Sequence, residues 1–173
     1  IVEDELIVSL DLQQRVRDLG YEIVGSADNG DLAIKLILES RPDLILMDIN
    51  IKGQIDGIET STLISQKYNV PIIYLTAYSD KATLERAKIT TLYGYLIKPI
   101  EERDLHIAIE ISLTKFQMEK QLMESEKRLS ITLQSIGDGV ISTDQNGRIT
   151  QMNITAEKMC GCSFAEAKGL PLS

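Results

Sequence analysis

The chain has 173 residues, 43% of them hydrophobic, and a formal charge of −8, which suits one packed domain plus a remainder. The acidic balance argues against direct nucleic acid binding, because phosphate contacts depend on clustered Lys and Arg. No apolar run approaches the roughly 18 residues of a membrane span, and two cysteines, Cys160 and Cys162, do not make a disulfide framework. We therefore expect a cytoplasmic protein without membrane contact.

Apolar runs and helical patterns alternate through the first two thirds of the chain. The runs that predict strands cover 1–4, 21–26, 44–48, 71–76 and 95–98. The helical patterns cover 6–19, 30–40, 58–68 and 81–92, and a last helix begins at 101–104. This order, with short connections, predicts an α/β fold, namely a five-stranded parallel sheet with helices on both faces.

A long helix is predicted after this alternating region, because residues 105–136 contain neither Pro nor Gly. Apolar and small polar residues recur there at spacings of four and three: Met118, Leu122, Ser125, Leu129, Thr132 and Ile136. Such a repeat favours a coiled coil that continues out of the first domain. The alternative is a single amphipathic linker that lies on its neighbours.

The last part of the chain carries a hairpin signal. Asn146-Gly147 separates two β-rich runs, Gly137–Asp144 and Arg148–Asn153, and Asn-Gly between such runs is a strong hairpin predictor. With the helical residues that follow, the pattern resembles the start of a PAS sensor domain over Leu129 to Ser173. The resemblance implies a partial α+β PAS segment.

Polar side chains end four of the five predicted strands. Glu3 and Asp4 follow the first apolar run, Asp48 ends the third, and Thr76 and Lys98 end the fourth and fifth. The carboxyl ends of parallel strands meet at one edge of the sheet, where ligands bind in such folds. Three carboxylates that close together repel one another, and such clusters usually hold a cation between them.

This ordered set of residues resembles the receiver domain of two-component response regulators, the CheY-like family. The resemblance covers Ile1 to Phe116 and depends on the motif Glu3-Asp4, Asp48, Thr76-Ala77, Tyr95 and Lys98-Pro99. It implies a flavodoxin-like fold and the Mg²⁺-dependent transfer of a phosphoryl group from a phosphohistidine of a sensor histidine kinase. Phosphorylation would then switch the linker and the PAS output.

The resemblance also implies which residues accept the phosphoryl group and hold the metal. Asp48 is the phosphoacceptor, and Asp4, Asp48 and the backbone carbonyl of Asn50 ligate Mg²⁺, with Glu3 acting partly through water. Oxygen ligands of this kind are those that the hard Mg²⁺ ion takes. Aspartate is also an established acceptor in covalent phosphoryl transfer.

Three further residues are implied to respond to the phosphoryl group. Thr76 would hydrogen-bond it, Lys98 would pair with its charge, and Tyr95 would change rotamer, although an aromatic beside the sheet can also be plain core. Pro99 after Lys98 suits a tight turn, which a cis peptide bond would allow. The receiver face and the linker helix would form a homodimer when phosphorylated.

Two other functions fit parts of this pattern. Haloacid-dehalogenase-like phosphatases also use a strand-end Asp with Mg²⁺, but they need a second Asp two residues later as general acid, and Asn50 cannot serve in that role. The other alternative is a phosphorylation-independent docking module, a pseudo-receiver, against which the complete acidic set argues.

We divide the chain into a receiver domain at 1–112, a linker or signalling helix at 113–134 and a partial PAS domain at 135–173. The chain starts inside a strand and stops without a terminal helix, so we expect it to be a piece of a longer protein. We expect a signalling switch that catalyses only its own phosphorylation and dephosphorylation.

Overall fold

The computed structural model describes residues 1–77, 93–135 and 137–172. The chain divides into two units, Ile1–Met118 and Glu119–Ser173. The helix predicted at 81–92 lies outside the described residues. The predicted boundaries at 112 and 134 both fall within one continuous helix and stay a prediction.

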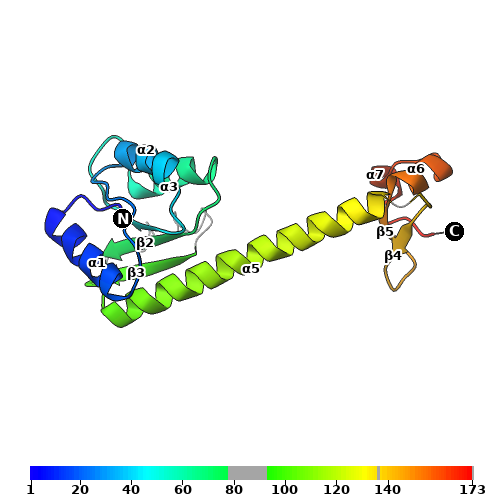
Figure 1. Ribbon diagram of the computed structural model, residues 1–173. Coiled ribbons are helices and arrows are strands. Elements are labelled where there is room, and N and C mark those ends of the chain that lie inside the picture. Colours follow the sequence, from blue (N-terminus) through cyan, green and yellow to red (C-terminus); the bar gives the residue numbers. More distant parts are fainter. Residues whose placement is uncertain (78–92, 136, 173) are drawn as a thin grey trace. The chain divides into compact units, whose positions relative to one another are not determined.

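A parallel sheet lies at the centre of the first unit. Its strands are β1 (Ile45–Asp48), β2 (Ile72–Ala77) and β3 (Gly94–Lys98), in the order β1-β2-β3 (Figure 1). Asp48 pairs with Leu75, and Lys98 pairs with Ala77, so the strands end at the same edge of the sheet. All four residues of β1 are buried, as expected for an apolar strand covered on both faces.

Two further segments extend this sheet without forming full strands. Val2 makes single parallel bridges, to Ala27 on one side and to Met47 of β1 on the other. The prediction of five full strands is therefore not met, because the described residues contain three strands in this sheet. Residues 21–24 are not assigned to a strand, and the segment around Val2 pairs through single bridges only.

Helices cover both faces of the sheet. The described helices of this unit are α1 (Leu6–Asp18), α2 (Gly30–Ser40), α3 (Gly57–Ser65) and the first part of α5 (Glu102–Ser135). Met47 and Tyr74 belong to a core with α2 and α3, whereas Leu46 and Leu75 belong to a core with α1 and α5 (Figure 1). This alternation of strand side chains confirms the predicted two-faced arrangement.

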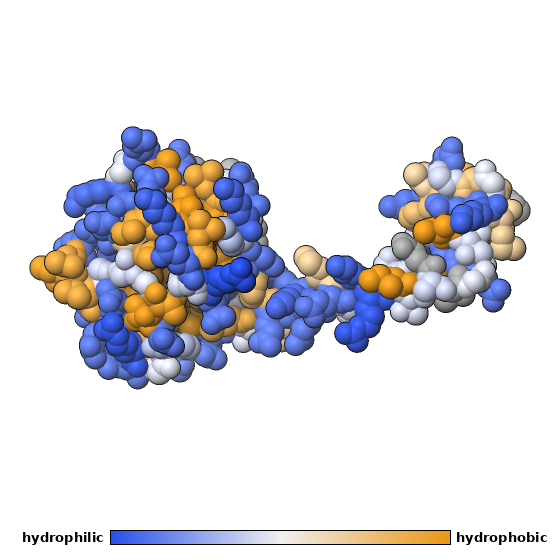
Figure 2. All heavy atoms as spheres, turned by 45° about the horizontal axis from the view of Figure 1, so that its top comes forward, coloured by the Kyte–Doolittle hydropathy of each residue, from blue (hydrophilic) through white to orange (hydrophobic). Residues whose placement is uncertain are grey.

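Helix α5 is 34 residues long. Leu105 and Ile109, in its first turns, are buried in the core of the first unit. Farther along, Met118, Leu122 and Leu129 are 65%, 61% and 59% exposed, and Figure 2 shows apolar residues on an otherwise hydrophilic helix surface. The long linker helix is therefore confirmed. No helix of the described ranges has the length and apolar composition that a membrane crossing requires.

The second unit contains a hairpin and two short helices. They are β4 (Ile141–Thr143), β5 (Ile149–Met152), α6 (Ile154–Cys160) and α7 (Phe164–Ala167). β4 and β5 pair antiparallel, and Gly147 in their turn has φ 73°, a left-handed conformation that favours glycine. The Asp144 carboxylate accepts the amides of Asn146 and Arg148 at 2.8 and 2.9 Å. The hairpin prediction is thus confirmed.

Asn153 joins the end of α5 to the hairpin and to α6. Its Nδ2 donates to the carbonyls of Leu133 and Asp138 at 3.0 and 2.9 Å. Its Oδ1 accepts the amides of Val140 and Ala156, both at 2.9 Å. The side chain is 3% exposed, so all four bonds lie where water cannot easily replace them.

We predict that Asn153→Ala destabilises the second unit by about 2 kcal/mol, because it leaves buried amides and carbonyls unpaired and removes the cap of α6. Hydrogen exchange of the amides of α6 and β4 measures the loss. Asn146→Ala, in the exposed turn, is the matched control and should leave exchange nearly unchanged. Equal exchange in the two variants would contradict the assigned role.

Candidate functional site

Three carboxylates converge at the carboxyl edge of the sheet. One oxygen from each of Glu3, Asp4 and Asp48 lies within 4.8 Å of the others. Glu3 and Asp48 are only 3% and 5% exposed, because the strand-like pairing around Val2 and the end of β1 hold them in the interior of the sheet. The structure thus brings together the three acids that the sequence predicts to share one site.

The Lys98 ammonium joins two of these carboxylates. Its Nζ donates to Glu3 Oε2 and to Asp48 Oδ2, each at 2.6 Å. Burial opposes the positive charge, but the hydrogen bonds and charges of Asp48 and Glu3 outweigh it and raise the pKa of Lys98. Burial raises the pKa of Glu3, and the hydrogen bond from Lys98 offsets part of that rise. Lys98 therefore stays charged at neutral pH and neutralises part of the acidic cluster.

The loop after β1 holds the second oxygen of Asp48. The amide of Asn50 donates to Asp48 Oδ1 at 3.0 Å. Gly57, at the start of α3, passes so close to the strand end that a Cβ on it would lie 2.0 Å from the carbonyl oxygen of Asp48. Only glycine allows this approach. The Asp48 carboxylate is thus fixed from both sides, by Lys98 and by the loop.

Thr76 and Tyr95 differ in their environment. Thr76 is buried, and its hydroxyl donates to the carbonyl of Ala77 at 3.2 Å, which is long for a hydroxyl donor. Tyr95 is 49% exposed on β3, so the alternative that it is a core aromatic is wrong. The Lys98–Pro99 peptide bond is cis, one of the forms that the sequence left open.

A lysine outside the predicted site residues also reaches the acids. Lys52 Nζ lies 3.1 Å from Asp4 Oδ2, with the two side chains 82% and 15% exposed. Lys52 neither ends a strand nor belongs to the motif, so its place depends on how the loop between β1 and α3 folds. No signal in the sequence marks it.

The donor atoms of this site fit Mg²⁺. Mg²⁺ takes oxygen ligands, keeps several of its waters and needs only one or two carboxylates from the protein. Asp4 and Asp48 offer carboxylate oxygens. Asn50, whose amide donates to Asp48, carries the backbone carbonyl that would be a further oxygen ligand. The buried negative charge of Glu3 adds to the attraction for a cation.

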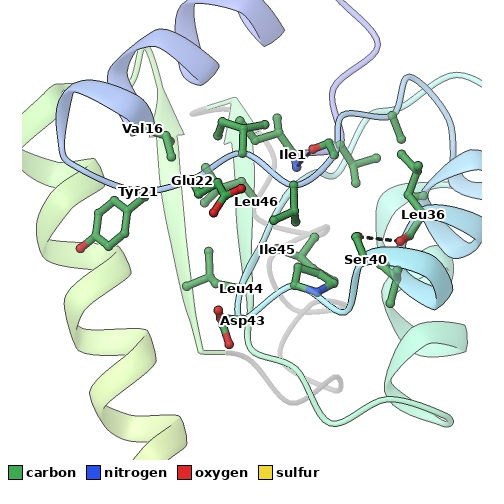
Figure 3. Close-up of a pocket in the computed structure, with 18 of the residues that line it drawn as sticks. Ile1, Val16, Tyr21, Glu22, Leu36, Ser40, Asp43, Leu44, Ile45 and Leu46 are labelled. Carbon is green, nitrogen blue, oxygen red and sulfur yellow. Dashed lines mark hydrogen bonds between the residues drawn. The ribbon is translucent and has the colours of Figure 1, made fainter.

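A cavity of about 240 Å³ lies elsewhere, between the segment around residues 21–25 and β1 (Figure 3). Tyr21, Leu36 and Ile45 are among its mainly apolar lining residues. At its edge the backbone nitrogen of Ile1 donates to the Gly25 carbonyl at 3.0 Å. None of the predicted site residues lines this cavity, so it is not the candidate site.

A two-faced parallel sheet with an acidic pocket and a lysine at its carboxyl edge defines a receiver-type α/β domain. Residues 1–110 match the response regulator receiver domain, and residues 127–173 match the PAS fold. The chain therefore belongs to the response regulator family, with a receiver domain followed by a PAS region. Such regulators are signalling proteins of two-component systems rather than classical enzymes, and they interact with a histidine kinase or another phosphodonor.

Individual proteins agree with this assignment. The transcriptional regulatory protein PdtaR of Mycobacterium tuberculosis is 39% identical over 117 residues, which are 68% of this chain and 57% of PdtaR. The receiver domain of a modulated diguanylate cyclase from Desulfovibrio desulfuricans G20 aligns with a TM-score of 0.65 and 37% identity, over 68% of this chain and 94% of that one. The chain thus spans little more than half the length of the curated relative PdtaR.

A third similar structure comes from a larger regulator. It is the N-terminal domain of a response regulator/sensory box/GGDEF three-domain protein from Carboxydothermus hydrogenoformans. It aligns with a TM-score of 0.63 and 30% identity, over 68% of this chain and 94% of that domain. The similarity thus again concerns an N-terminal domain of a regulator with several domains.

We predict that Lys98→Met lowers the stability of the metal-free receiver by about 2 kcal/mol at pH 7, because two buried carboxylates lose their cation. The loss should shrink as the pH falls. A carboxyl whose folded pKa is raised, as in Glu3, takes up a proton more readily when folded, so its penalty disappears below that pKa. Denaturant unfolding in EDTA at pH 7 and pH 4.5 tests this.

Lys67→Met is the control for the Lys98 experiment. Lys67 is an exposed residue that follows α3, and removal of its charge should change stability little at either pH. A loss in Lys98→Met that is the same at both pH values would show that lost packing, rather than unpaired carboxylates, causes the effect.

Proposed function

We propose that this chain is the phosphoaccepting part of a response regulator, in which Asp48 takes a phosphoryl group from the phosphohistidine of a sensor histidine kinase with Mg²⁺ as cofactor. The observation that carries the proposal is the pairing of the buried Asp48 with the Lys98 ammonium at 2.6 Å, beside Glu3 and Asp4. We place the protein in the cytoplasm, with the receiver at 1–112, the linker at 113–134 and the PAS segment at 135–173.

Asp48 is the nucleophile in this mechanism. A carboxylate oxygen attacks phosphorus, a P–O bond forms, and the P–N bond to the donor imidazole breaks, with its electron pair leaving on the imidazole nitrogen. Charge in this loose transition state spreads over the equatorial phosphoryl oxygens, so positioning and countercharge supply most of the catalysis. Lys98 supplies the countercharge, and the Asn50 amide restricts rotation of the carboxylate.

Asp4, Asp48 and the Asn50 carbonyl would hold Mg²⁺, with Glu3 acting partly through water. The ion would supply additional positive charge to the phosphoryl oxygens. The protein residues orient and neutralise the pocket before the donor arrives, since Lys98 already spans Glu3 and Asp48.

Thr76 and Tyr95 carry the response in this proposal. The Thr76 hydroxyl makes a long hydrogen bond to Ala77, so a charged phosphoryl oxygen is a stronger acceptor for it. Movement of Thr76 towards that oxygen frees space for the ring of Tyr95, which is half exposed on the neighbouring strand. The exposed face of β3 then changes with phosphorylation.

We predict that a cognate kinase or acetyl phosphate, with Mg²⁺, adds one phosphoryl group to the wild-type chain and none to Asp48→Asn. The amide introduced by this substitution keeps the shape of the side chain but cannot form the acyl phosphate. Intact-mass measurement gives the answer. Asp11→Asn removes an exposed carboxylate of α1 and should label like the wild type.

The result separates the two functions that remain. Labelling of the wild type and of Asp11→Asn, but not of Asp48→Asn, supports Asp48 as the phosphoacceptor. Equal labelling of Asp48→Asn would move the acceptor to another residue. A wild type that neither donor labels, while it still binds the kinase, would favour the phosphorylation-independent docking module.

We also propose that phosphorylation promotes a homodimer through the receiver face and α5. Met118, Leu122 and Leu129 lie at coiled-coil spacing and are exposed. Ser125 and Thr132 interrupt the same seam, which would make pairing marginal and therefore open to control. Direct nucleic acid binding is not part of this proposal.

We predict that beryllofluoride, a phosphoryl mimic, with Mg²⁺ tightens self-association of the wild type by about tenfold in sedimentation. Leu122→Ser should abolish this gain, because it removes a seam residue. Met123→Ser, an equally exposed apolar residue off the seam, should keep it. The same association constant with and without beryllofluoride would contradict the coupling, and equal effects of both substitutions would contradict the seam.

A further inference from the structure

Asp4 already forms an ion pair with a lysine of the protein itself. Lys52 Nζ lies 3.1 Å from Asp4 Oδ2, and Asp4 is 15% exposed. Lys98 forms ion pairs with both Glu3 and Asp48. Each carboxylate of the acidic cluster therefore has an ammonium partner, and the lysine on Asp4 is one that the proposed phosphotransfer mechanism does not use.

The backbone holds Lys52 where it can reach Asp4. Lys52 forms a parallel bridge to Asn29, and the Asn29 side chain caps α2 by accepting the amide of Leu32 at 2.9 Å. A Cβ on Gly30, the next residue, would lie 2.9 Å from the side chain of Ile55 in the same loop. The loop is thus packed against the start of α2, and the direction of the Lys52 side chain follows from that packing.

Lys52 lies beside a crevice that offers its ammonium other acidic groups. The crevice has a volume of about 440 Å³, and Asp4, Asp28, Asp31 and Lys52 are among its lining residues. A lysine released from Asp4 therefore stays in a negatively charged environment. This lowers the free-energy cost of exchanging it for another cation.

We infer that Lys52 is a built-in competitor for the metal: its ammonium holds Asp4 in the metal-free receiver, and Mg²⁺ must displace it. This inference rests on the proposed function, because it takes Asp4 to be a metal ligand. In this inference Lys52 acts only through Asp4 and takes no direct part in phosphoryl transfer. It keeps metal affinity low by neutralising the most accessible carboxylate of the cluster.

The expected effect is modest because Lys52 is largely exposed. Exposed ion pairs are weak, so removing the competitor should tighten Mg²⁺ binding only about threefold. The gain should disappear at high concentrations of NaCl, because salt screens exposed charges. Lys52→Arg keeps the charge and should bind Mg²⁺ as the wild type does.

A titration of the metal-free chain with MgCl₂ measures this without any phosphodonor. The amide of Asn50 is a suitable NMR reporter, because it donates to Asp48 beside the site. The variants are Lys52→Ala, Lys52→Arg, Asp4→Asn and Lys67→Ala. The last removes an exposed lysine that follows α3 and controls for the change in net charge.

Tighter binding in Lys52→Ala alone supports the inference. Unchanged binding in Lys52→Ala, with binding lost in Asp4→Asn, overturns the inference and leaves the metal site intact. Equal tightening in Lys52→Ala and Lys67→Ala overturns it in favour of a general charge effect. Binding that is unchanged in Asp4→Asn overturns the proposed ligand set, and the inference with it.

Discussion

The ion pairs of Lys98 with Glu3 and Asp48 are the interaction on which the pocket depends. Two carboxylates that are 3% and 5% exposed would repel each other and lose hydration without a cation between them. The ammonium at 2.6 Å from both makes their burial tolerable and ties β3 to the segment around Val2 and to the end of β1. The same ion pair orients Asp48, the aspartate that a phosphodonor would meet at this edge.

Much of this arrangement follows from the sequence. Asp48, Thr76 and Lys98 each end an apolar run, and parallel strands bring such ends to one edge. The two helix-covered faces and the long α5 follow in the same way from periodicity. These features depend on local patterns, which a single sequence displays directly.

The features that could not be predicted depend on contacts between distant segments. Lys52 meets Asp4 only because its loop packs against α2, and nothing in the residues around it indicates this. The number of full strands depends on how far Val2 and Ala27 pair beyond a single bridge. The exposure of Tyr95 likewise depends on what covers β3, and β-rich composition alone does not distinguish a covered strand face from an open one.

The proposed switch requires a hydrogen-bond donor that is weakly engaged before phosphorylation and a continuous element that links the receiver to the PAS segment. The Thr76 hydroxyl meets the first condition, since its bond to Ala77 is 3.2 Å long and little is lost when it turns to a charged acceptor. Helix α5 meets the second, because Leu105 and Ile109 anchor it in the receiver core while Asn153 bonds its last turn, at Leu133, to the PAS segment. The proposed signal therefore passes through one continuous helix, which is anchored in the receiver core at one end and hydrogen-bonded to the PAS segment at the other.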